Sequence, residues 1–481
     1  MHVVHIASEA VPYAKTGGLG DVLGALPPAL ARAGVQTTVC LPGYRPALRV
    51  AGDTDVLGEV YAPVSTRTEP FQVLGLRGAP VPTVLLGSLA YFDREGLYGE
   101  DGRDYPDNAE RFVAFCRAAL EWMRTWSTPP DVLHVHDWQT ALVPAFLRAG
   151  PELHPELGAT RTVITIHNLA FQGRFPATDW HLLNLDRRWF APDALEFYGG
   201  INFLKAGLVF SDAITTVSPR YAREIQGPDL GEGLDGLLRA RAASLTGILN
   251  GADYGAWNPA TDPALPARYD RTDLAGKARC RAALRAEMGL RADSTGPLLA
   301  VISRLAEQKG IDLVVRAGRE LLERTPVQLV VLGSGEHRFE AGLATLRDRF
   351  PGRVALRVGF DDALAHRIEA GADVFLMPSR YEPCGLSQIY SLRYGTVPVV
   401  HATGGLDDTV EDFDPGRATG TGFKFSPFTD EAFVGAIGRA IEVWRDREKW
   451  TRLVDNGMRM DFSWERAAVG YRRVYDGLSP R

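Results

Sequence analysis

The sequence is poor in cysteine and has no long apolar run. Its four cysteines are scattered, without a CxxC pair or the spacing of a metal site: Cys40, Cys116, Cys280 and Cys384. This usage is typical of a reducing compartment. No apolar run approaches the roughly 20 residues that span a bilayer, and residues 1–10 lack the basic region of a secretion signal. We therefore expect a soluble, cytoplasmic protein that has no membrane partner.

The chain also lacks an excess of positive charge. Its 53 Lys and Arg residues are outnumbered by 59 Asp and Glu residues, which gives a formal net charge of −6. Proteins that bind nucleic acid or anionic membranes usually carry a basic surface. We expect no nucleic-acid partner, and a few well-placed cations must hold any anionic ligand.

Length and periodicity indicate two α/β domains. The 481 residues exceed the roughly 250–300 that usually share one core. Short β-branched runs alternate with amphipathic stretches such as 108–126, which is typical of parallel sheets with helices on both faces. The Pro- and Asp-rich segment 258–273 interrupts this rhythm and marks an inter-domain region. The runs predicted to be strands are 3–7, 37–41, 132–135, 162–166, 213–217, 298–302, 328–332, 354–358, 374–377 and 397–400.

A glycine-rich segment follows the first predicted strand. It reads KTGGLGDV at residues 15–22 and opens a helical pattern. Glycines allow backbone N–H groups to approach a ligand, a helix start favours anions, and Lys15 adds a positive charge. The segment matches neither GxGxxG nor the Walker pattern. It is either an anion-binding loop or a glycine-rich turn with a solvated lysine.

A second loop, SRLAEQKG at residues 303–310, lies between a predicted strand and a helix. Arg304 and Lys309 can converge there on a diphosphate, the first as a fork and the second as a point charge. The alternative is two surface cations, which contribute about 0–1 kcal/mol in any ion pair.

Further polar groups follow other predicted strands. EPCGLSQ at residues 382–388 begins with a carboxylate that can hold sugar hydroxyls or cap a helix, and TGGL at 403–406 can add backbone donors. HDW at 136–138 and IHNL at 166–169 place polar groups beside aromatic ones, as sugar subsites do, although a histidine after a strand is often structural. Because ligands of open α/β sheets bind at the carboxyl ends of strands, these loops define the candidate site.

Two DxD pairs, Asp53/Asp55 and Asp412/Asp414, match the metal-binding pattern of one class of glycosyltransferases. Both lie in Gly- and Pro-flanked, loop-like segments. We interpret them as solvated turns, and no His/Cys/Asp cluster has convincing metal spacing. The sequence therefore predicts neither a metal nor another cofactor.

Taken together, these segments resemble the bacterial glycogen synthase and plant starch synthase family. KTGGLGDV, HDW, IHNLAFQG, ILNGAD at 248–253, SRLAEQKG, EPCGLSQ and TGGL followed by DTV occur in family order, from Val3 to Trp464. The resemblance implies an α/β GT-B fold, with two Rossmann-like parallel-sheet domains that face each other across a deep cleft. It implies an acceptor and catalytic domain at 1–255, joined by a final helix at 462–481, and a nucleotide-sugar domain at 256–461.

The resemblance also implies a reaction, the metal-free transfer of glucose from ADP-glucose to the non-reducing end of an α-1,4-glucan such as glycogen, with retention of configuration. Lys15 and Gly18 would contact the distal phosphate and the glucose, and Arg304 and Lys309 would neutralise the diphosphate. Glu382 would hold glucose hydroxyls, and His167 would lie near C6 of the sugar. The remaining residues expected to bind substrate are Asp21, Asp137, Asn168, Asn250, Cys384, Gly385, Leu386, Ser387, Gly404 and Gly405.

Three positions depart from the family pattern. Ser387 replaces a usual Thr, Phe360 replaces a frequent Tyr, and Tyr390 stands where broader GT-B enzymes have a second Glu. The rival interpretations are a UDP-glucose-dependent relative of the sucrose or trehalose synthase type and a binding protein without activity. The choice of adenine over uracil rests on the family resemblance.

Overall fold

A computed structural model describes residues 1–478, which divide into two compact units. Unit 1 comprises Met1–Val217, Ala222–Gly251 and the segment from Trp464 onward, and unit 2 comprises Ser218–Tyr221 and Ala252–Ser463. The predicted domain limits, 255/256 and 461/462, stand close to the crossings at 251/252 and 463/464. The sequence did not indicate that residues 218–221 group with unit 2.

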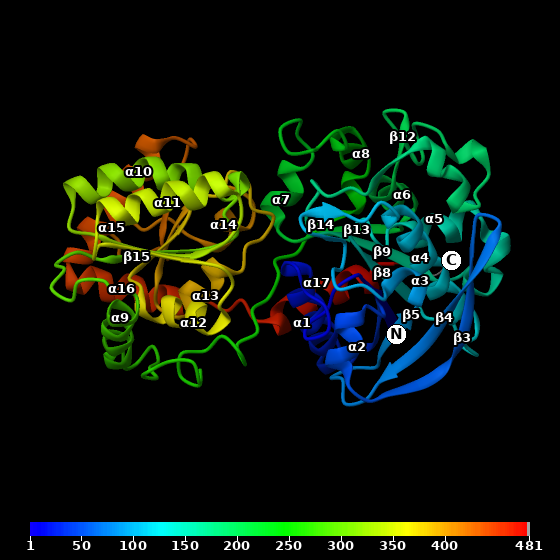
Figure 1. Cartoon of the computed structure of the whole chain (residues 1–481), viewed down its shortest axis with the longest axis horizontal. Coiled ribbons are helices and arrows are strands. Elements are labelled where there is room, and N and C mark those ends of the chain that lie inside the picture. Colours follow the sequence, from blue (N-terminus) through cyan, green and yellow to red (C-terminus); the bar gives the residue numbers. More distant parts are fainter. Residues whose placement is uncertain (479–481) are drawn as a thin grey trace. The chain divides into compact units, whose positions relative to one another are not determined.

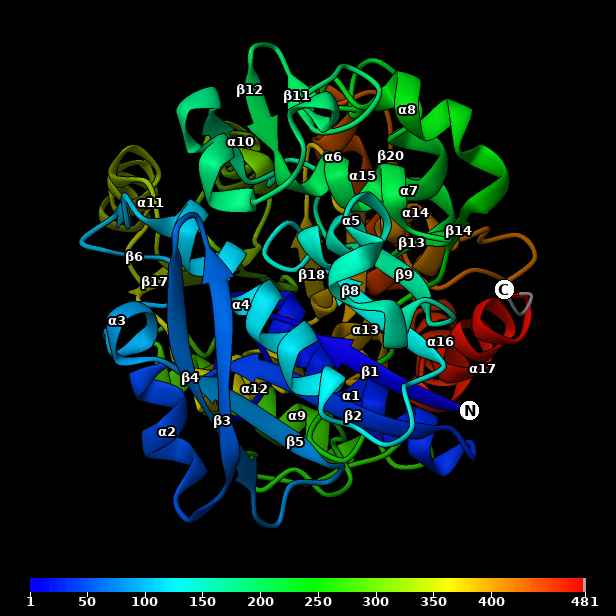
Figure 2. The ribbon, with the colours of Figure 1, turned by 90° about the vertical axis from the view of Figure 1, so that its right-hand side faces the viewer.

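Unit 1 is built around a nine-stranded sheet in the order β14-β13-β9-β8-β1-β2-β5-β4-β3. The strands from β14 to β5 are parallel, whereas β4 pairs antiparallel with both β5 and β3. Figure 2 shows β3 and β4 as a long pair of strands. The nine strands are β1 (His2–Ile6), β2 (Gln36–Pro42), β3 (Thr54–Val64), β4 (Arg67–Leu76), β5 (Thr83–Gly87), β8 (Val132–His136), β9 (Arg161–Ile166), β13 (Ala213–Thr216) and β14 (Leu245–Gly247).

Smaller strands and the helices complete unit 1. The short strands are β6 (Gly99–Glu100), β7 (Arg103–Asp104), β10 (Arg174–Pro176), β11 (Glu196–Phe197) and β12 (Gly200–Asn202). The helices are α1 (Gly18–Arg32), α2 (Arg45–Ala51), α3 (Leu89–Phe92), α4 (Asn108–Arg124), α5 (Leu142–Ala149), α6 (Phe203–Phe210), α7 (Pro219–Glu224, shared with unit 2), α8 (Asp235–Ala240) and α17 (Trp464–Asp476). The final helix, α17, packs against α1, and it buries Tyr471 and Tyr475 completely or nearly so.

Unit 2 holds a six-stranded, fully parallel sheet in the order β17-β16-β15-β18-β19-β20. Its strands are β15 (Leu298–Ile302), β16 (Gln328–Gly333), β17 (Val354–Val358), β18 (Val374–Met377), β19 (Val397–His401) and β20 (Phe423–Phe425). Its helices are α9 (Ala275–Glu287), α10 (Ile311–Arg324), α11 (His337–Arg349), α12 (Asp362–Gly371), α13 (Ser387–Arg393), α14 (Gly404–Thr409), α15 (Asp430–Arg445) and α16 (Arg447–Met458).

Two apolar cores cover the two faces of the unit 2 sheet. One joins β-strand side chains to buried residues of α10, α11, α15 and α16, and the other joins them to residues of α9, α12 and α14. In Figure 1, α10 and α11 lie on one side of β15, and α12 and α13 lie on the other. This is the arrangement that the alternating strand and helix patterns predicted.

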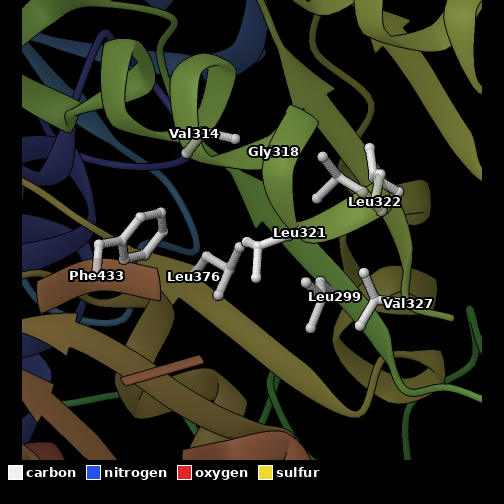
Figure 3. Close-up of a pocket in the computed structure, with 9 residues that line it drawn as sticks. Leu299, Val314, Gly318, Leu321, Leu322, Val327, Leu376 and Phe433 are labelled. Carbon is white, nitrogen blue, oxygen red and sulfur yellow. The ribbon is translucent and has the colours of Figure 1, made fainter. Parts of the chain in front are cut away.

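A small cavity lies within the first of these cores, beneath α10 (Figure 3). Leu321, Leu376 and Phe433 are among its lining residues, and all nine of them are apolar or glycine. Because the lining offers no polar side chain, the cavity is a packing void rather than a site for a sugar or a phosphate.

All ten strands predicted from the sequence are present, and their ends differ by no more than a residue or so. The predicted helix at 108–126 is α4. Each of the four cysteines is buried, and none of them forms a disulfide. Within residues 1–478, no helix combines the length and apolarity needed to cross a bilayer.

Candidate functional site

Each main sheet has a point where its strand connections diverge. In unit 1, β1 lies between β2 and β8, and in unit 2, β15 lies between β16 and β18. Ligands of such sheets bind beyond the carboxyl ends of the strands at this point. The loops after β1 and β8 carry Lys15 and Asp137, and the loops after β15 and β18 carry Lys309 and Glu382. The motifs found in the sequence therefore fall at these switch points.

The glycine-rich loop after β1 is fastened from below by Glu9, which is buried. Its carboxylate accepts hydrogen bonds from the backbone N and the hydroxyl of Thr16, both at 2.6 Å, and from the N of Gly17 at 3.3 Å. Tyr98 donates its phenolic hydroxyl to the same carboxylate at 2.7 Å. The amides of Thr16 and Gly17 are thus engaged by Glu9, so a ligand would have to use the amides that begin at Gly18.

The N-terminus of α1 is open above this loop. Gly17 caps the helix without a side-chain hydrogen bond, and a Cβ atom added at Gly17 or Gly18 would meet nothing within 4 Å. Lys15 Nζ lies 2.7 Å from Asp21 Oδ1, and 44% of the lysine side chain is exposed. A positive side chain beside uncapped helix amides is a suitable place for a phosphate.

The loops after β8 and β9 are joined by Asp137. Its Oδ1 accepts the backbone N–H of His167 at 2.7 Å, and its own N donates to Thr165 O at 3.0 Å. Asp137 has φ = 55°, a left-handed conformation that few non-glycine residues adopt. Burial raises the pKa of this carboxyl to about 7, against the lowering effect of the two backbone N–H groups of residues 167 and 168. A strained, partly protonated carboxyl at a strand end is typical of functional sites.

His167 belongs to a row of imidazoles. Its Nε2 lies 3.0 Å from His136 Nδ1, and His136 Nε2 lies 3.3 Å from His5 Nδ1. His134 is next to this row, but its ring contacts Tyr475 Oη at 2.7 Å and Thr165 Oγ1 at 2.6 Å. Burial lowers the pKa of His5 and of His167 to about 3, so the rings are neutral.

Three of these imidazoles, His5, His134 and His136, bring their ring nitrogens within 4.8 Å of one another, as metal ligands would. Five of the six nitrogens, however, already have hydrogen-bond partners. Only His5 Nε2 is left without one among the described residues. A metal needs several free lone pairs, so we interpret the cluster as a hydrogen-bonded network.

Two further residues predicted to bind substrate have different surroundings. Asn168 uses Oδ1 to accept the backbone N–H of Ala170 at 3.1 Å, which is a local turn contact. Asn250, which follows β14, is buried, and its Oδ1 has no hydrogen-bond partner in the part of the chain that the structure describes. A buried, unpaired amide oxygen is costly, so Asn250 is the stronger candidate for a ligand contact.

In unit 2, Lys309 and Glu382 are brought together. Lys309 Nζ lies 2.6 Å from Glu382 Oε2, and the two side chains are only 18% and 7% exposed. Ser379 donates its hydroxyl to the same oxygen at 2.9 Å. Gly310, which follows Lys309, has φ = 67°, and a Cβ there would lie 1.8 Å from Pro378 O. This close approach of the two loops fixes the distance between the cation and the carboxylate.

Arg304 lies at the mouth of the same loop and is exposed. Within residues 1–478, its side chain makes one hydrogen bond, and this bond is long, from Nη2 to Gln308 Oε1 at 3.2 Å. Gln308 in turn accepts the N–H of Arg380 at its backbone O, at 2.8 Å, which ties the loop after β15 to the loop after β18. The guanidinium is therefore free to reorient toward an anion.

The loop of residues 382–387 lies against the start of α14. A Cβ at Gly404 would lie 1.9 Å from Glu382 O, one at Gly405 would lie 2.1 Å from Cys384 O, and Gly405 N donates to Glu382 O at 3.0 Å. Gln388 is buried and holds the loop from the other side, with Nε2 donating to Cys384 O and Gly385 O, both at 3.0 Å. Leu386 and Ser387 then begin α13. The predicted residues of this loop thus lie together and pack against the start of α14.

The pair Asp412/Asp414 borders a turn, as expected, whereas Asp55 of the other pair lies in β3 and not in a loop. Three of these four carboxylates are engaged within the fold. Asp55 pairs with Arg77, and Asp412 accepts the N–H of Lys424 at 2.7 Å and pairs with Arg439 at 2.8 Å. Asp414 accepts the N–H of Gly416 at 2.8 Å.

Known proteins share this architecture and sequence. The profile of the starch synthase catalytic domain matches residues 2–240, and that of the group 1 glycosyl transferases matches residues 287–456. The glycogen synthase of Anaeromyxobacter dehalogenans (strain 2CP-C) is 51% identical over 485 residues, covering 100% of both chains. The chain belongs to the glycogen synthase family. Another family member, from Koribacter versatilis, is 46% identical over 99% of this chain and 98% of its own length.

Solved structures agree with membership of the glycogen synthase family. The catalytic domain of starch synthase IV from Arabidopsis thaliana, bound to ADP and acarbose, has a TM-score of 0.89 and 35% identity, and covers 99% of this chain and 98% of its own. A sucrose-phosphate synthase from Thermosynechococcus elongatus, with a TM-score of 0.62 and 20% identity, shares the fold alone. The predicted α/β GT-B fold is confirmed, and the chain is a glycosyltransferase.

For this glycogen synthase family member, the roles of individual residues stay predictions. Gln388 belongs to the EPCGLSQ motif, but the sequence gave it no role. Glu9, Ser379 and His5 were not singled out. His134 and His136 alternate in HVH, a period-two pattern that places both on one face of a strand. That pattern was the available signal for the imidazole row.

Proposed function

We propose that this chain transfers glucose from ADP-glucose to the non-reducing end of an α-1,4-glucan such as glycogen, with retention of configuration and release of ADP. Family membership supports glucosyl transfer, and the ADP in the Arabidopsis structure supports an adenine nucleotide as the donor. We further propose that the protein works in the cytoplasm.

The observation that carries the proposal is the contact between Lys309 and Glu382. A cation and a carboxylate are held 2.6 Å apart at the switch point of the unit 2 sheet, where Gly404 and Gly405 let the start of α14 pack closely against the loop of Glu382. The cation suits the diphosphate of a sugar nucleotide, and the carboxylate suits the hydroxyls of the sugar. One small site therefore provides for both halves of the donor.

The other residues take roles around that pair. Arg304 joins Lys309 in neutralising the diphosphate, while the amides of Cys384, Gly385 and Leu386 approach the sugar. In unit 1, Lys15 and the first amides of α1 serve the distal phosphate. Asp137 and Asn250 line the donor or acceptor side, and His167 lies near C6. Unit 1 would act as the acceptor and catalytic domain, and unit 2 as the nucleotide-sugar domain.

The chemistry asks mainly for charge stabilisation. The diphosphate is a good leaving group, and preorganised cations aimed at its growing charge are usually the largest catalytic contribution. Glu382 is committed to Lys309 and Ser379, so it is poorly placed to be a covalent nucleophile. We propose front-face departure and attack through an oxocarbenium-like state, in which the leaving phosphate accepts the proton of the acceptor hydroxyl.

Glycogen-dependent release of ADP from ADP-glucose tests the proposal. We expect ADP release to require both substrates, to exceed turnover with UDP-glucose, and to lengthen the glucan by α-1,4 linkages. Faster turnover with UDP-glucose would overturn the donor assignment, and ADP-glucose binding without transfer would overturn the activity. A trapped covalent glucosyl-enzyme would overturn the front-face mechanism.

A further inference from the structure

The row of imidazoles in unit 1 runs from the interior of the sheet to the candidate site. His5 on β1 and His136 on β8 are fully buried, whereas His167, after β9, is half-buried. The ring contacts run in one line, from His5 Nδ1 to His136 Nε2 and from His136 Nδ1 to His167 Nε2. Within residues 1–478, Nδ1 of His167 has no hydrogen-bond partner. It is the atom left to contact a ligand.

Each ring of the row is neutral, since burial lowers the pKa of all three imidazoles. A neutral imidazole carries one N–H and one lone pair, so it donates on one side and accepts on the other. All hydrogen bonds along the row must therefore be donated in the same direction. Either every ring is protonated at Nδ1, or every ring is protonated at Nε2.

The buried end of the row distinguishes the two directions. His5 Nε2 is buried and has no partner among the described residues. If the rings carry their protons on Nδ1, this atom is a bare lone pair. If they carry them on Nε2, it is an orphaned N–H, which is the rarer situation in folded proteins. The first direction leaves His167 with Nδ1–H facing outward.

We propose that His136, backed by His5, is a positioning residue that fixes the tautomer of His167, so that His167 presents an N–H donor to a hydroxyl oxygen of the transferred sugar. Naming the sugar rests on the proposed function, whereas the tautomer does not. His136 touches no substrate in this scheme. It acts by donating Nδ1–H to His167 Nε2, which leaves the proton of His167 no place other than Nδ1.

His134 provides a matched control from the same strand and face. It is as buried as His136, but its ring bonds to Tyr475 and Thr165 and stands outside the row. Its substitution perturbs the same core without removing the donor to His167.

The test measures the tautomer of His167. The ¹⁵N chemical shifts of its two ring nitrogens report the tautomer in the full chain labelled with ¹⁵N-histidine. The His167→Asn variant identifies which signals belong to His167. In the unmutated protein at pH 7 we expect a pyrrole-like Nδ1 and a pyridine-like Nε2. His136→Phe removes the donor, and we expect His167 to shift toward the Nε2–H form. His136→Asn, whose amide N–H lies near the position of Nδ1, should retain Nδ1–H, and His134→Asn should leave the tautomer unchanged.

Activity provides the second readout. We expect His136→Phe to raise the KM for the sugar nucleotide about tenfold with little change in kcat, because one hydrogen bond to the substrate is lost. In His136→Asn the KM should return most of the way to the wild-type value. An Nε2–H or doubly protonated His167 in the unmutated protein would overturn the proposal. So would an unchanged tautomer in His136→Phe or an equal shift in His134→Asn. If the tautomers behave as expected but no glucose is transferred, the proposed function is wrong, whereas the proposal that His136 fixes the tautomer of His167 still holds.

Discussion

At the scale of single residues, the ion pair of unit 2 links catalysis to stability. Glu382 is 7% exposed and depends on Lys309 for its charged partner. We expect Lys309→Ala to lower kcat by at least about 10²–10³ and to lower the free energy of unfolding by roughly 1–3 kcal/mol, because a buried carboxylate loses its partner. Steady-state kinetics and urea unfolding measure the two effects.

Arg304→Ala is the matched comparison for this prediction. Its guanidinium is exposed and makes one long hydrogen bond among the described residues. Its loss should therefore lower kcat similarly while leaving the free energy of unfolding within about 0.5 kcal/mol of the wild-type value. Full activity in a folded Lys309→Ala protein would contradict the role given to the lysine. Equal stability of the two variants would contradict the role of the ion pair.

Asp137 makes a prediction about pH. Its folded pKa of about 7 lies above the unfolded value of about 3.9, so the folded protein binds a proton that the unfolded chain releases between these values. The free energy of unfolding therefore falls as pH rises from about 4 to 7, by roughly 1.4 kcal/mol per unit. Asp137→Asn removes this loss, because its Oδ1 still accepts the N–H of His167 without any charge.

The difference in stability between wild type and Asp137→Asn, measured by chemical unfolding from pH 4 to 8, checks this. The buried histidines titrate in both proteins and cancel in the difference. We expect the free energy of unfolding of the variant, relative to that of the wild type, to rise up to about pH 7. Above that pH the difference should stay constant. A gap that is constant across the range would show that Asp137 stays ionised in the fold.

Sequence patterns located the loops at residue scale but not their internal contacts. Lys309 and Glu382 were each recognised, yet their ion pair joins loops 73 positions apart in sequence, and no local pattern specifies such a contact. Glu9 was missed for a similar reason, since Tyr98, one of its partners, lies far along the chain. The sequence also gave no sign that the N–H groups of Thr16 and Gly17 in the glycine loop donate to Glu9.

At the scale of elements, α15 contains a glycine that lowers the stability of the helix. Gly435 lies inside this helix, is exposed, and has nothing within 4 Å of an added Cβ. We expect Gly435→Ala to raise the free energy of unfolding by about 0.5–1 kcal/mol, because alanine loses less backbone entropy in a helix. Thermal unfolding monitored by circular dichroism measures the gain.

Gly404, at the start of α14, is the contrasting position. It has φ = 45°, and its added Cβ would lie 1.9 Å from Glu382 O. Gly404→Ala should destabilise the protein and distort the Glu382 loop, so activity falls along with stability. An equal change in the free energy of unfolding for Gly435→Ala and Gly404→Ala would show that neither the space around the added Cβ nor the φ angle determines the effect.

Strands of the parallel sheets were predictable because both faces are buried, which produces continuous β-branched runs. The pair β3 and β4 was missed. β3 is largely exposed, is interrupted by Gly58 and Pro63, and contains a register shift between Val56 and Gly58. An edge strand of this kind has neither a continuous apolar run nor clean alternation, so the parallel pattern expected for unit 1 does not extend to this edge.

At the scale of the whole molecule, the chain enters the long segment of unit 2 after Gly251 and returns to unit 1 at Trp464. The two passages run side by side, since Ala252 N donates to Phe462 O at 2.7 Å and Ala252 bridges Ser463. A Cβ at Gly251 would lie 2.6 Å from both the N and the Cα of Trp464. We expect Gly251→Ala to cost about 1–3 kcal/mol of stability by displacing the start of α17.

Hydrogen exchange along α17 together with urea unfolding checks this prediction. Protection of α17 should fall more than that of α10, and Gly435→Ala is the control for adding a methyl group elsewhere. Unchanged exchange in α17 would contradict the close packing of Gly251 on Trp464.

The Pro- and Asp-rich segment from residue 258 was expected to mark the inter-domain region, but its first residues pack within unit 2. Trp257 stacks between His366 and Tyr390, with ring centroids 3.8 and 4.1 Å away, and Asp262 accepts hydrogen bonds from Tyr394 at 2.6 Å. Residues 257–262 are therefore held within unit 2. Any hinge on this passage lies nearer Gly251, and its motion stays a prediction.

The return of α17 to unit 1 has a consequence for biosynthesis. Tyr475 of α17 bonds to His134 in the middle of the first sheet. A ribosome releases nearly all of unit 2 as one stretch, residues 252–463, after the short segment Ser218–Tyr221. This stretch can fold while translation continues. The first half to be synthesised is the last to be completed, since its core closes only after the final helix has left the exit tunnel.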